Sequence, residues 1–185
     1  MAFSKIAAEN LGGSTLPALA GGSLTGVGIT VGDNWRQNNN TNISSGEHFL
    51  TGNWERTDQN GAGHIGTALS QSSGIFVFPS SGIYYLTFEL YATLENDETS
   101  LRSQVSTTIN NSSYAVAAYG SVGIQRSSGS YSLTSIAQTL FDVTDTAQCK
   151  VKFGYNAAVA PSSSEIKGDT NYNQTHFIAI RLGDT

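Results

Sequence analysis

Charged side chains are scarce in this sequence: only 12% of its 185 residues are Asp, Glu, Lys or Arg, about half the usual share of roughly 25%. The formal net charge is −5, and Lys and Arg do not cluster. A nucleic-acid groove needs clustered cations to displace counterions from phosphates, so we expect no nucleic-acid partner. Gly, Ser, Thr and Asn are abundant instead, which indicates a surface solvated by hydroxyls and amides.

Long apolar runs and paired cysteines are also missing. Because no run approaches the roughly 20 apolar residues that a bilayer requires, we expect no membrane span. The N-terminal stretch has no long apolar segment, so it does not resemble a secretory signal. Cys149 is the only cysteine, which excludes an intrachain disulfide and a zinc site built from several thiols. Its alternation with Val151 and Phe153 favours a buried small hydrophobic residue over a nucleophile.

Catalytic motifs are absent as well. Neither a nucleophile elbow nor a phosphate loop occurs, and the histidines His48, His64 and His176 do not have the spacing of metal ligands. His176 alternates with Ile178 on what we expect to be the core-facing side of the last strand, where a structural role is favoured. The carboxylates Glu95, Asp97 and Glu98 of the acidic loop LENDETS, residues 94–100, could ligate calcium, but solvation of a turn is the simpler interpretation. We therefore expect no enzymatic activity, no cofactor and no metal.

The sequence does contain strand-length runs separated by turn residues. In residues 74–94, GIFVFPSSGIYYLTFELYATL, the even positions from Tyr84 to Leu90 are large and apolar and predict a core-facing side. The odd positions include Tyr85, Glu89 and Tyr91, a mixture too aromatic for an ordinary surface. Asn60-Gly61 is a strong turn signal. Similar runs follow, and together they predict an all-β antiparallel sandwich: LRSQVSTTIN, YAVAAYGSVGI, YSLTSIAQTLFDV, QCKVKFGYN and QTHFIAIRL.

Residues 1–30 differ from the rest and predict an extended N-terminal arm ahead of a head formed by residues 31–185. The segment has two Gly pairs and no sustained period of 2 or 3.6. A floppy tail is the alternative interpretation. Its apolar residues favour an anchoring role, in which the contacts to another protein come from Phe3, Ile6, Leu11, Leu16, Leu19 and Leu24.

The order of these runs resembles the C1q/TNF-like jelly roll. The resemblance is carried by an aromatic strand ending in Pro79, the Tyr-rich run from Gly82, the hairpin FDVTDTAQCKVKF and the terminal strand THFIAIRL. It covers about four fifths of the chain, and it implies an antiparallel jelly-roll sandwich that assembles as a homotrimer. In more detail, DNWRQ, TGNWERTD, GHIGTALSQSSGIFVFPSSGIY and the arm phrase LPALAGGSLTGV are similar to virion proteins of marine bacteriophages.

The trimer implied by this resemblance offers a partner for the second face of the Tyr-rich strand. Large flat side chains fill a threefold axis well, and their hydroxyls find partners there. We expect an aromatic interface formed by Tyr85, Tyr91, Tyr155 and Phe177. The alternative is that the tyrosines are only half-buried surface residues.

The resemblance also implies a function and a place. We expect a bacteriophage virion structural protein, assembled in the host bacterial cytoplasm and exposed on the virion surface as a homotrimer. A capsid decoration or cement protein is favoured, in which the short arm laces across the major capsid protein. The alternative is a tail-fibre or adhesin head that binds a bacterial surface receptor or glycan. A hydrolase of surface polysaccharide is a weaker third interpretation.

Overall fold

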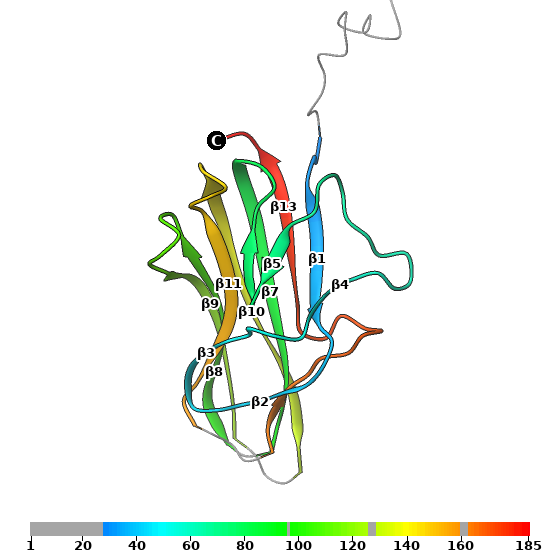
Figure 1. The fold of residues 1–185 in the computed structure, drawn as a ribbon. Coiled ribbons are helices and arrows are strands. Elements are labelled where there is room, and N and C mark those ends of the chain that lie inside the picture. The colour runs from blue at the N-terminus through cyan, green and yellow to red at the C-terminus, as the bar shows by residue number, and fades with distance from the viewer. Residues whose placement is uncertain (1–27, 96, 126–128, 160–162) are drawn as a thin grey trace, which may run out of the picture.

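The computed structural model describes residues 28–95, 97–125, 129–159 and 163–185, and the predicted arm is therefore almost wholly outside the described residues. Within these ranges the regular structure consists of strands, which form the two antiparallel sheets of a sandwich (Figure 1). No helix in this part of the chain is long and apolar enough to cross a membrane. The strands are β1 (Gly32–Gln37), β2 (Thr41–Asn42), β3 (Gly46–Phe49), β4 (Trp54–Arg56), β5 (Ser70–Ser72), β6 (Ile75–Val77), β7 (Gly82–Leu94), β8 (Glu98–Thr108), β9 (Ala115–Ile124), β10 (Tyr131–Val143), β11 (Lys150–Ala157), β12 (Glu165–Ile166) and β13 (His176–Gly183).

Sheet A is built around β7, the Tyr-rich strand. Strand β10 pairs with the whole length of β7 on one side, and β13 and β12 pair with successive parts of β7 on the other. Strands β1 and β4 then continue the sheet beyond β13, while β2 pairs with β12. β1 begins and β13 ends at the same end of the sandwich, and β2 lies in the opposite half (Figure 1).

Sheet B has the order β5-β6-β11-β8-β9, and β3 adds to β11 beyond β6. β11 therefore carries two short strands along one edge, β6 at its beginning and β3 at its end. The short strands β2, β5 and β12 escaped the sequence analysis. Each has only two or three residues, too few to show a strand pattern. β2 and β12 pair with each other across more than 120 residues of sequence, whereas β5 pairs with β6, which follows it directly.

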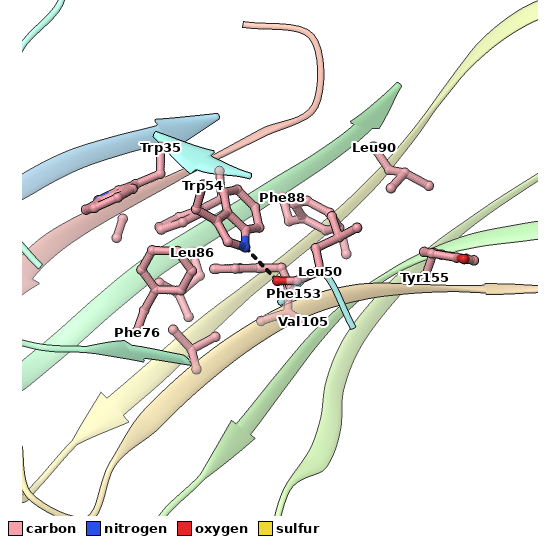
Figure 2. Packing of buried hydrophobic residues seen from close by; sticks show 14 of the residues in the cluster. Trp35, Leu50, Trp54, Phe76, Leu86, Phe88, Leu90, Val105, Phe153 and Tyr155 are labelled. Atoms are coloured by element: carbon pink, nitrogen blue, oxygen red, sulfur yellow. Dashed lines mark hydrogen bonds between the residues drawn. The ribbon is translucent and has the colours of Figure 1, made fainter. Parts of the chain in front are cut away.

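The core lies between the two sheets and is rich in aromatic rings. The even positions of β7, Tyr84 to Leu90, are 0% exposed, which confirms the predicted core-facing side. Phe177 from sheet A packs against Phe76 and Phe153 from sheet B, with ring centroids 4.5 and 4.1 Å away. Trp54 lies against the same group and donates its indole N–H to the Leu50 carbonyl at 2.7 Å (Figure 2). Each such pair adds about 0.5–1.5 kcal/mol beyond burial of area.

Two further predictions from the residues are confirmed. Asn60 and Gly61 have φ angles of 57° and 83°, the positive values that a tight turn of this kind requires. Cys149 is 0% exposed, with its Sγ 3.8 Å from the hydroxyl of Thr144. This thiol therefore packs as a small hydrophobic group.

Candidate self-association surface

The outer face of sheet A carries the odd positions of β7. Tyr85, Thr87, Glu89 and Tyr91 are all half-buried, whereas their even neighbours point into the core. What lies beside them is set by strand register, because residues paired across a sheet project from the same face.

An apolar row crosses this face at the level of Tyr85. Tyr85 is paired with Leu140 of β10 on one side and with Ile180 of β13 on the other. Ile180 is paired with Gly32 of β1, which is bridged to Ile65. A methyl group on Gly32 would lie only 3.4 Å from Cδ1 of Ile65, so the isoleucine side chain occupies the place that the glycine leaves open. We call Leu140, Tyr85, Ile180 and Ile65 the outer row.

The outer row is accessible in the single chain. Leu140 is 62% exposed and Ile65 is 50% exposed. Ile136, four residues before Leu140 on the same side of β10, is 48% exposed. Scattered exposed apolar residues are ordinary on protein surfaces, but an aligned set on one sheet face is typical of an interaction site.

The character of the face changes along the strands. The next row from the outer row contains Gln138, Thr87 and Ile178, and Gln138 donates a hydrogen bond to the Thr87 hydroxyl at 3.4 Å. The row after it places Glu89 between Ile136 and His176. The apolar part of the face is therefore concentrated toward the end of the sandwich where β1 begins and β13 ends.

The structure does not bring the four predicted interface residues together. Tyr85 and Tyr91 lie on the outer face of β7, but Phe177 is 0% exposed and belongs to the core cluster. Tyr155 is 3% exposed and projects into the interior from β11. The prediction that Phe177 and Tyr155 belong to the interface is therefore wrong. Both rings pack inside the single chain, and neither can form a common surface with Tyr85.

His176 and Ile178 also lie on the side of β13 opposite to the one predicted from the sequence. They lie on the outer side of β13, while Phe177 and Ala179 face the core. The reason is that HFIAIRL is apolar at both odd and even positions, so alternation alone could not decide which side is buried. The His176 ring is held at the surface by the Gln174 carbonyl, 3.2 Å from Nδ1.

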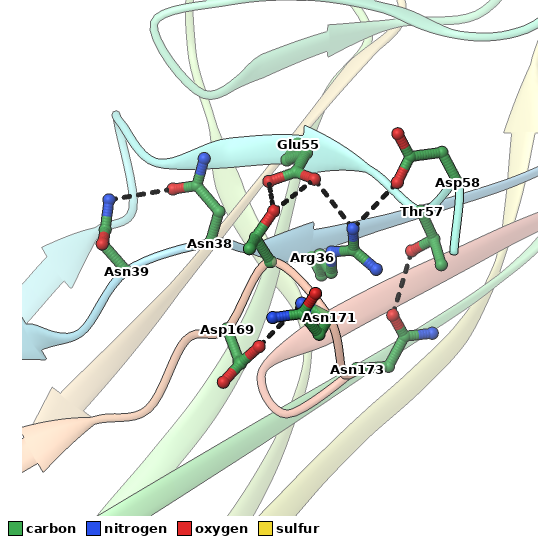
Figure 3. A network of polar contacts seen from close by, with 10 residues as sticks. Arg36, Asn38, Asn39, Glu55, Thr57, Asp58, Asp169, Asn171 and Asn173 are labelled. Atoms are coloured by element: carbon green, nitrogen blue, oxygen red, sulfur yellow. Dashed lines mark hydrogen bonds and ion pairs between the residues drawn. The ribbon is translucent and has the colours of Figure 1, made fainter. Parts of the chain in front are cut away.

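A polar network covers the other end of the outer face. The side chain of Arg36 is fully buried, and its Nη2 donates to Glu55 at 2.7 Å and to Asp58 at 3.0 Å (Figure 3). Thr170 donates its hydroxyl to Glu55 at 2.8 Å, which ties the segment before β13 to β4. The hydrogen bond from Arg36 lowers the pKa of Glu55, although burial acts in the opposite direction. This network joins β1, β4 and the segment before β13 at this end of the sheet, and its role is structural.

Glu98 in the acidic loop also has a structural place. It is 0% exposed, and its carboxylate accepts hydrogen bonds from the backbone N–H groups of Ser100, Ala158 and Val159 at 2.9, 3.2 and 3.3 Å. The simpler interpretation of a solvated turn is therefore wrong for this residue. Within the described ranges, no group of three His, Cys, Asp or Glu side chains is arranged to hold a metal ion.

Comparison with known proteins identifies the fold. No family model and no curated protein matches the sequence. Among solved structures, murine APRIL superposes with a TM-score of 0.55 at 13% identity, over 82% of this chain and 98% of that one. Eiger TNF from S. frugiperda superposes with a TM-score of 0.61 at 9% identity, over 85% and 94%. The chain is thus an all-β protein with a TNF-like antiparallel jelly-roll fold, which confirms the predicted jelly-roll sandwich. The homotrimer and the extended N-terminal arm stay predictions.

Proposed function

We propose that this chain is a non-enzymatic structural protein that works as a homotrimer on the surface of a bacteriophage virion. The outer row carries the proposal of self-association. Four aligned apolar side chains, from Leu140 to Ile65, give neighbouring subunits a surface that is costly to leave in water, at about 25 cal/mol per Å². Closed symmetry lets the same patch be used in every subunit.

The placement on a capsid is supported by the resemblance of the sequence to phage virion proteins and by the arm. The arm residues Phe3, Ile6, Leu11, Leu16, Leu19 and Leu24 lie outside the described residues, and their anchoring role is part of the proposal. A trimer presents three arms at once, so the first arm to bind raises the effective concentration of the next two. A decoration protein that cements the major capsid protein needs this property.

A second candidate is a tail-fibre or adhesin head that recognises a bacterial surface glycan. It is favoured by one observation, a cavity lined with amide, hydroxyl and aromatic groups beside Gln37. In either case the head acts by contact.

The number of copies in purified particles separates these two functions. Quantitative mass spectrometry against the major capsid protein should give about one copy per capsid subunit, or one trimer per local threefold position. A few tens of copies per particle would overturn the decoration role and favour the tail-fibre head. Absence from washed particles would overturn the virion proposal altogether.

A further inference from the structure

The outer face of sheet B carries cations that have no carboxylate partner among the described residues. β11 directs Val151 into the core, so the side chains of Lys150 and Lys152 lie on its outer side. Arg102 of β8 reaches the same face, because it is paired with Asn156, which lies on the same side of β11 as Lys152. None of these three cations forms an ion pair within the described ranges.

The other cations of the described ranges are already paired. Their partners are as follows: Arg36 pairs with Glu55 and Asp58, Arg56 with Asp33, Lys167 with Glu165, and Arg181 with Asp184. On the outer face of sheet B, Glu47 of β3 acts on Lys152 through space without forming an ion pair. The chain as a whole has a formal net charge of −5. Unpaired positive charge on one face of an acidic protein favours a negatively charged partner at that face.

Aromatic rings hold two of these cations in place. Nζ of Lys152 lies 3.5 Å from the centre of the Phe49 ring and 4.4 Å from that of the Tyr114 ring. The guanidinium of Arg102 lies 5.0 Å from the centre of the Tyr119 ring. A cation is attracted to the face of an aromatic ring by the ring quadrupole. Long side chains fixed in this way lose less conformational freedom when a partner binds.

Lys152 is also partly dehydrated in the single chain. Its side chain is half-buried, and burial lowers the pKa of its ammonium group, although Glu47 acts in the opposite direction. Folding has thus already removed part of the hydration shell of this cation. An incoming carboxylate therefore gains the attraction of the ammonium group at a smaller cost in lost hydration.

An aromatic row crosses the sheet between Lys152 and Arg102. Its members are paired one with the next across the strands: Tyr119, Gln104, Gly154 and Phe49. The Phe49 ring lies over the glycine, where a methyl group would come within 2.8 Å of Cδ1 of the ring. Tyr119 is 59% exposed. Protein interfaces are enriched in Tyr and Arg and depleted in Asp and Glu, which matches this face.

The strand spacing defines the pattern of a matching partner. The rows of Lys152 and Arg102 are separated by the aromatic row, so they lie about 13 Å apart along the strands, at about 3.3 Å per residue. In an extended segment the side chains at i, i+2 and i+4 point to the same side. Carboxylates at i and i+4 would therefore face the two cations, and an apolar side chain at i+2 would face the aromatic row.

We propose that the outer face of sheet B binds an extended acidic segment of a partner protein, with the pattern acid-x-apolar-x-acid. The two carboxylates pair with Lys152 and Arg102, and the apolar side chain lies on Tyr119 and Phe49 between them. The inference rests on the proposed function, contact between virion proteins, for the identity of the partner. It does not use the outer row. The outer faces of the two sheets point to opposite sides of the sandwich, so a trimer formed through sheet A leaves sheet B free.

The test uses the full chain and a probe peptide, Glu-Thr-Leu-Thr-Glu, blocked at both ends. Backbone NMR signals of β8, β9 and β11 follow the titration, and we expect them to shift with a dissociation constant on the order of 1 mM. Binding should weaken as the ionic strength rises from about 0.05 M to about 0.5 M, because salt screens charge pairs near a surface. Two control peptides should bind about threefold more weakly or less: one with Gln in place of both Glu residues, and Glu-Glu-Leu-Thr-Thr, in which the charges are adjacent.

Variants locate the site on the protein. Arg102→Gln should weaken binding of the probe about two- to fivefold, because it removes one ion pair, and the exposed position leaves folding intact. Lys152→Gln should have a similar effect. Lys167→Gln is the matched control, because Lys167 already pairs with Glu165 of β12 in sheet A, and it should leave binding unchanged.

The inference is overturned if the probe does not shift the signals of sheet B, if the Gln peptide binds as tightly as the probe, or if Arg102→Gln binds the probe as tightly as wild type. A glucuronate oligosaccharide that binds more tightly than the probe would also overturn it, because the face would then be a site for an anionic glycan. None of these results bears on the number of copies in purified particles, so the proposed function stands or fails separately.

Discussion

The buried carboxylate of Asp33 accepts a hydrogen bond from the indole N–H of Trp35, two residues further along β1, at 3.0 Å. The same carboxylate accepts the backbone N–H of Leu69 at 2.8 Å and pairs with Nε of Arg56 at 3.1 Å. The Arg56 guanidinium in turn lies 4.5 Å from the Trp35 ring. One acidic residue thus joins β1, β4 and the segment that leads into β5.

We expect Asp33→Ala to lower the free energy of unfolding by about 3–5 kcal/mol, because it leaves an arginine and two buried N–H groups without their acceptor. Asp184→Ala is the comparison, since Asp184 pairs with Arg181 at an exposed site. That change should cost less than about 1 kcal/mol. Equal midpoints of urea unfolding for the two variants would contradict the role given to Asp33.

The two sheets meet where Gly120 of β9 passes the backbone of Ile136 in β10. A methyl group on Gly120 would lie 2.0 Å from the Ile136 carbonyl oxygen, a contact that neither backbone can relieve alone. The hydroxyls of Ser103 and Ser135 lie 3.0 Å apart and also join these sheets. Gly120→Ala should therefore destabilise the head by about 1–3 kcal/mol or more.

The matched change for Gly120 is Gly63→Ala, because a methyl group at Gly63 meets no atom within 4 Å. Thermal unfolding measured by circular dichroism should show a lower midpoint for Gly120→Ala and little change for Gly63→Ala. A wild-type midpoint for Gly120→Ala would mean that β9 and β10 do not approach as closely as described.

The ion pair of Glu55 with Arg36 predicts a dependence of stability on pH. The pKa of Glu55 is lowered from its ordinary value of 4.5, first by the hydrogen bond from Arg36. A lowered folded-state pKa contributes stability that is complete above the unfolded-state value and is lost as the pH falls through the folded-state value. Between neutral pH and strong acid, Glu55→Gln should therefore lose less stability than wild type. Parallel curves of unfolding free energy against pH would contradict this assignment.

Glu98 supplies a test of a different buried carboxylate. In Glu98→Gln an amide N–H₂ replaces one of the oxygens that accept the backbone N–H groups of Ser100, Ala158 and Val159. We expect a loss of about 1–3 kcal/mol. The same change at exposed Glu47 should have almost no effect on unfolding. The prediction fails if both variants unfold at the same urea concentration.

The sandwich could be predicted from the sequence because most long strands have a pattern of alternating residues that shows which side is buried. In β7 the even positions are all large and apolar, so the core-facing side was recognised correctly. β13 has apolar residues on both sides, since its outer side contributes Ile178 and Ile180 to a half-buried face. Phe177 was therefore assigned to the wrong side.

The polar parts of the molecule were harder to predict. Arg36 meets Glu55 and Asp58 across 19 and 22 residues of sequence, and Gln37 meets Gly52 across 15. Such contacts depend on which strands become neighbours, which local patterns do not specify. Glu98 was read as part of a solvated acidic run because its backbone partners Ala158 and Val159 come from a distant loop.

The outer row leads to the measurement that tests our account most directly, native mass spectrometry of the wild-type head at micromolar concentration. We expect a trimer, and we expect Leu140→Lys to give a monomer that remains folded because Leu140 is 62% exposed. Ile109→Lys places the same charge at a site that is 71% exposed and lies outside the outer row, and it should remain a trimer. A monomeric wild type, or a Leu140→Lys variant that is still trimeric, would contradict self-association through this face.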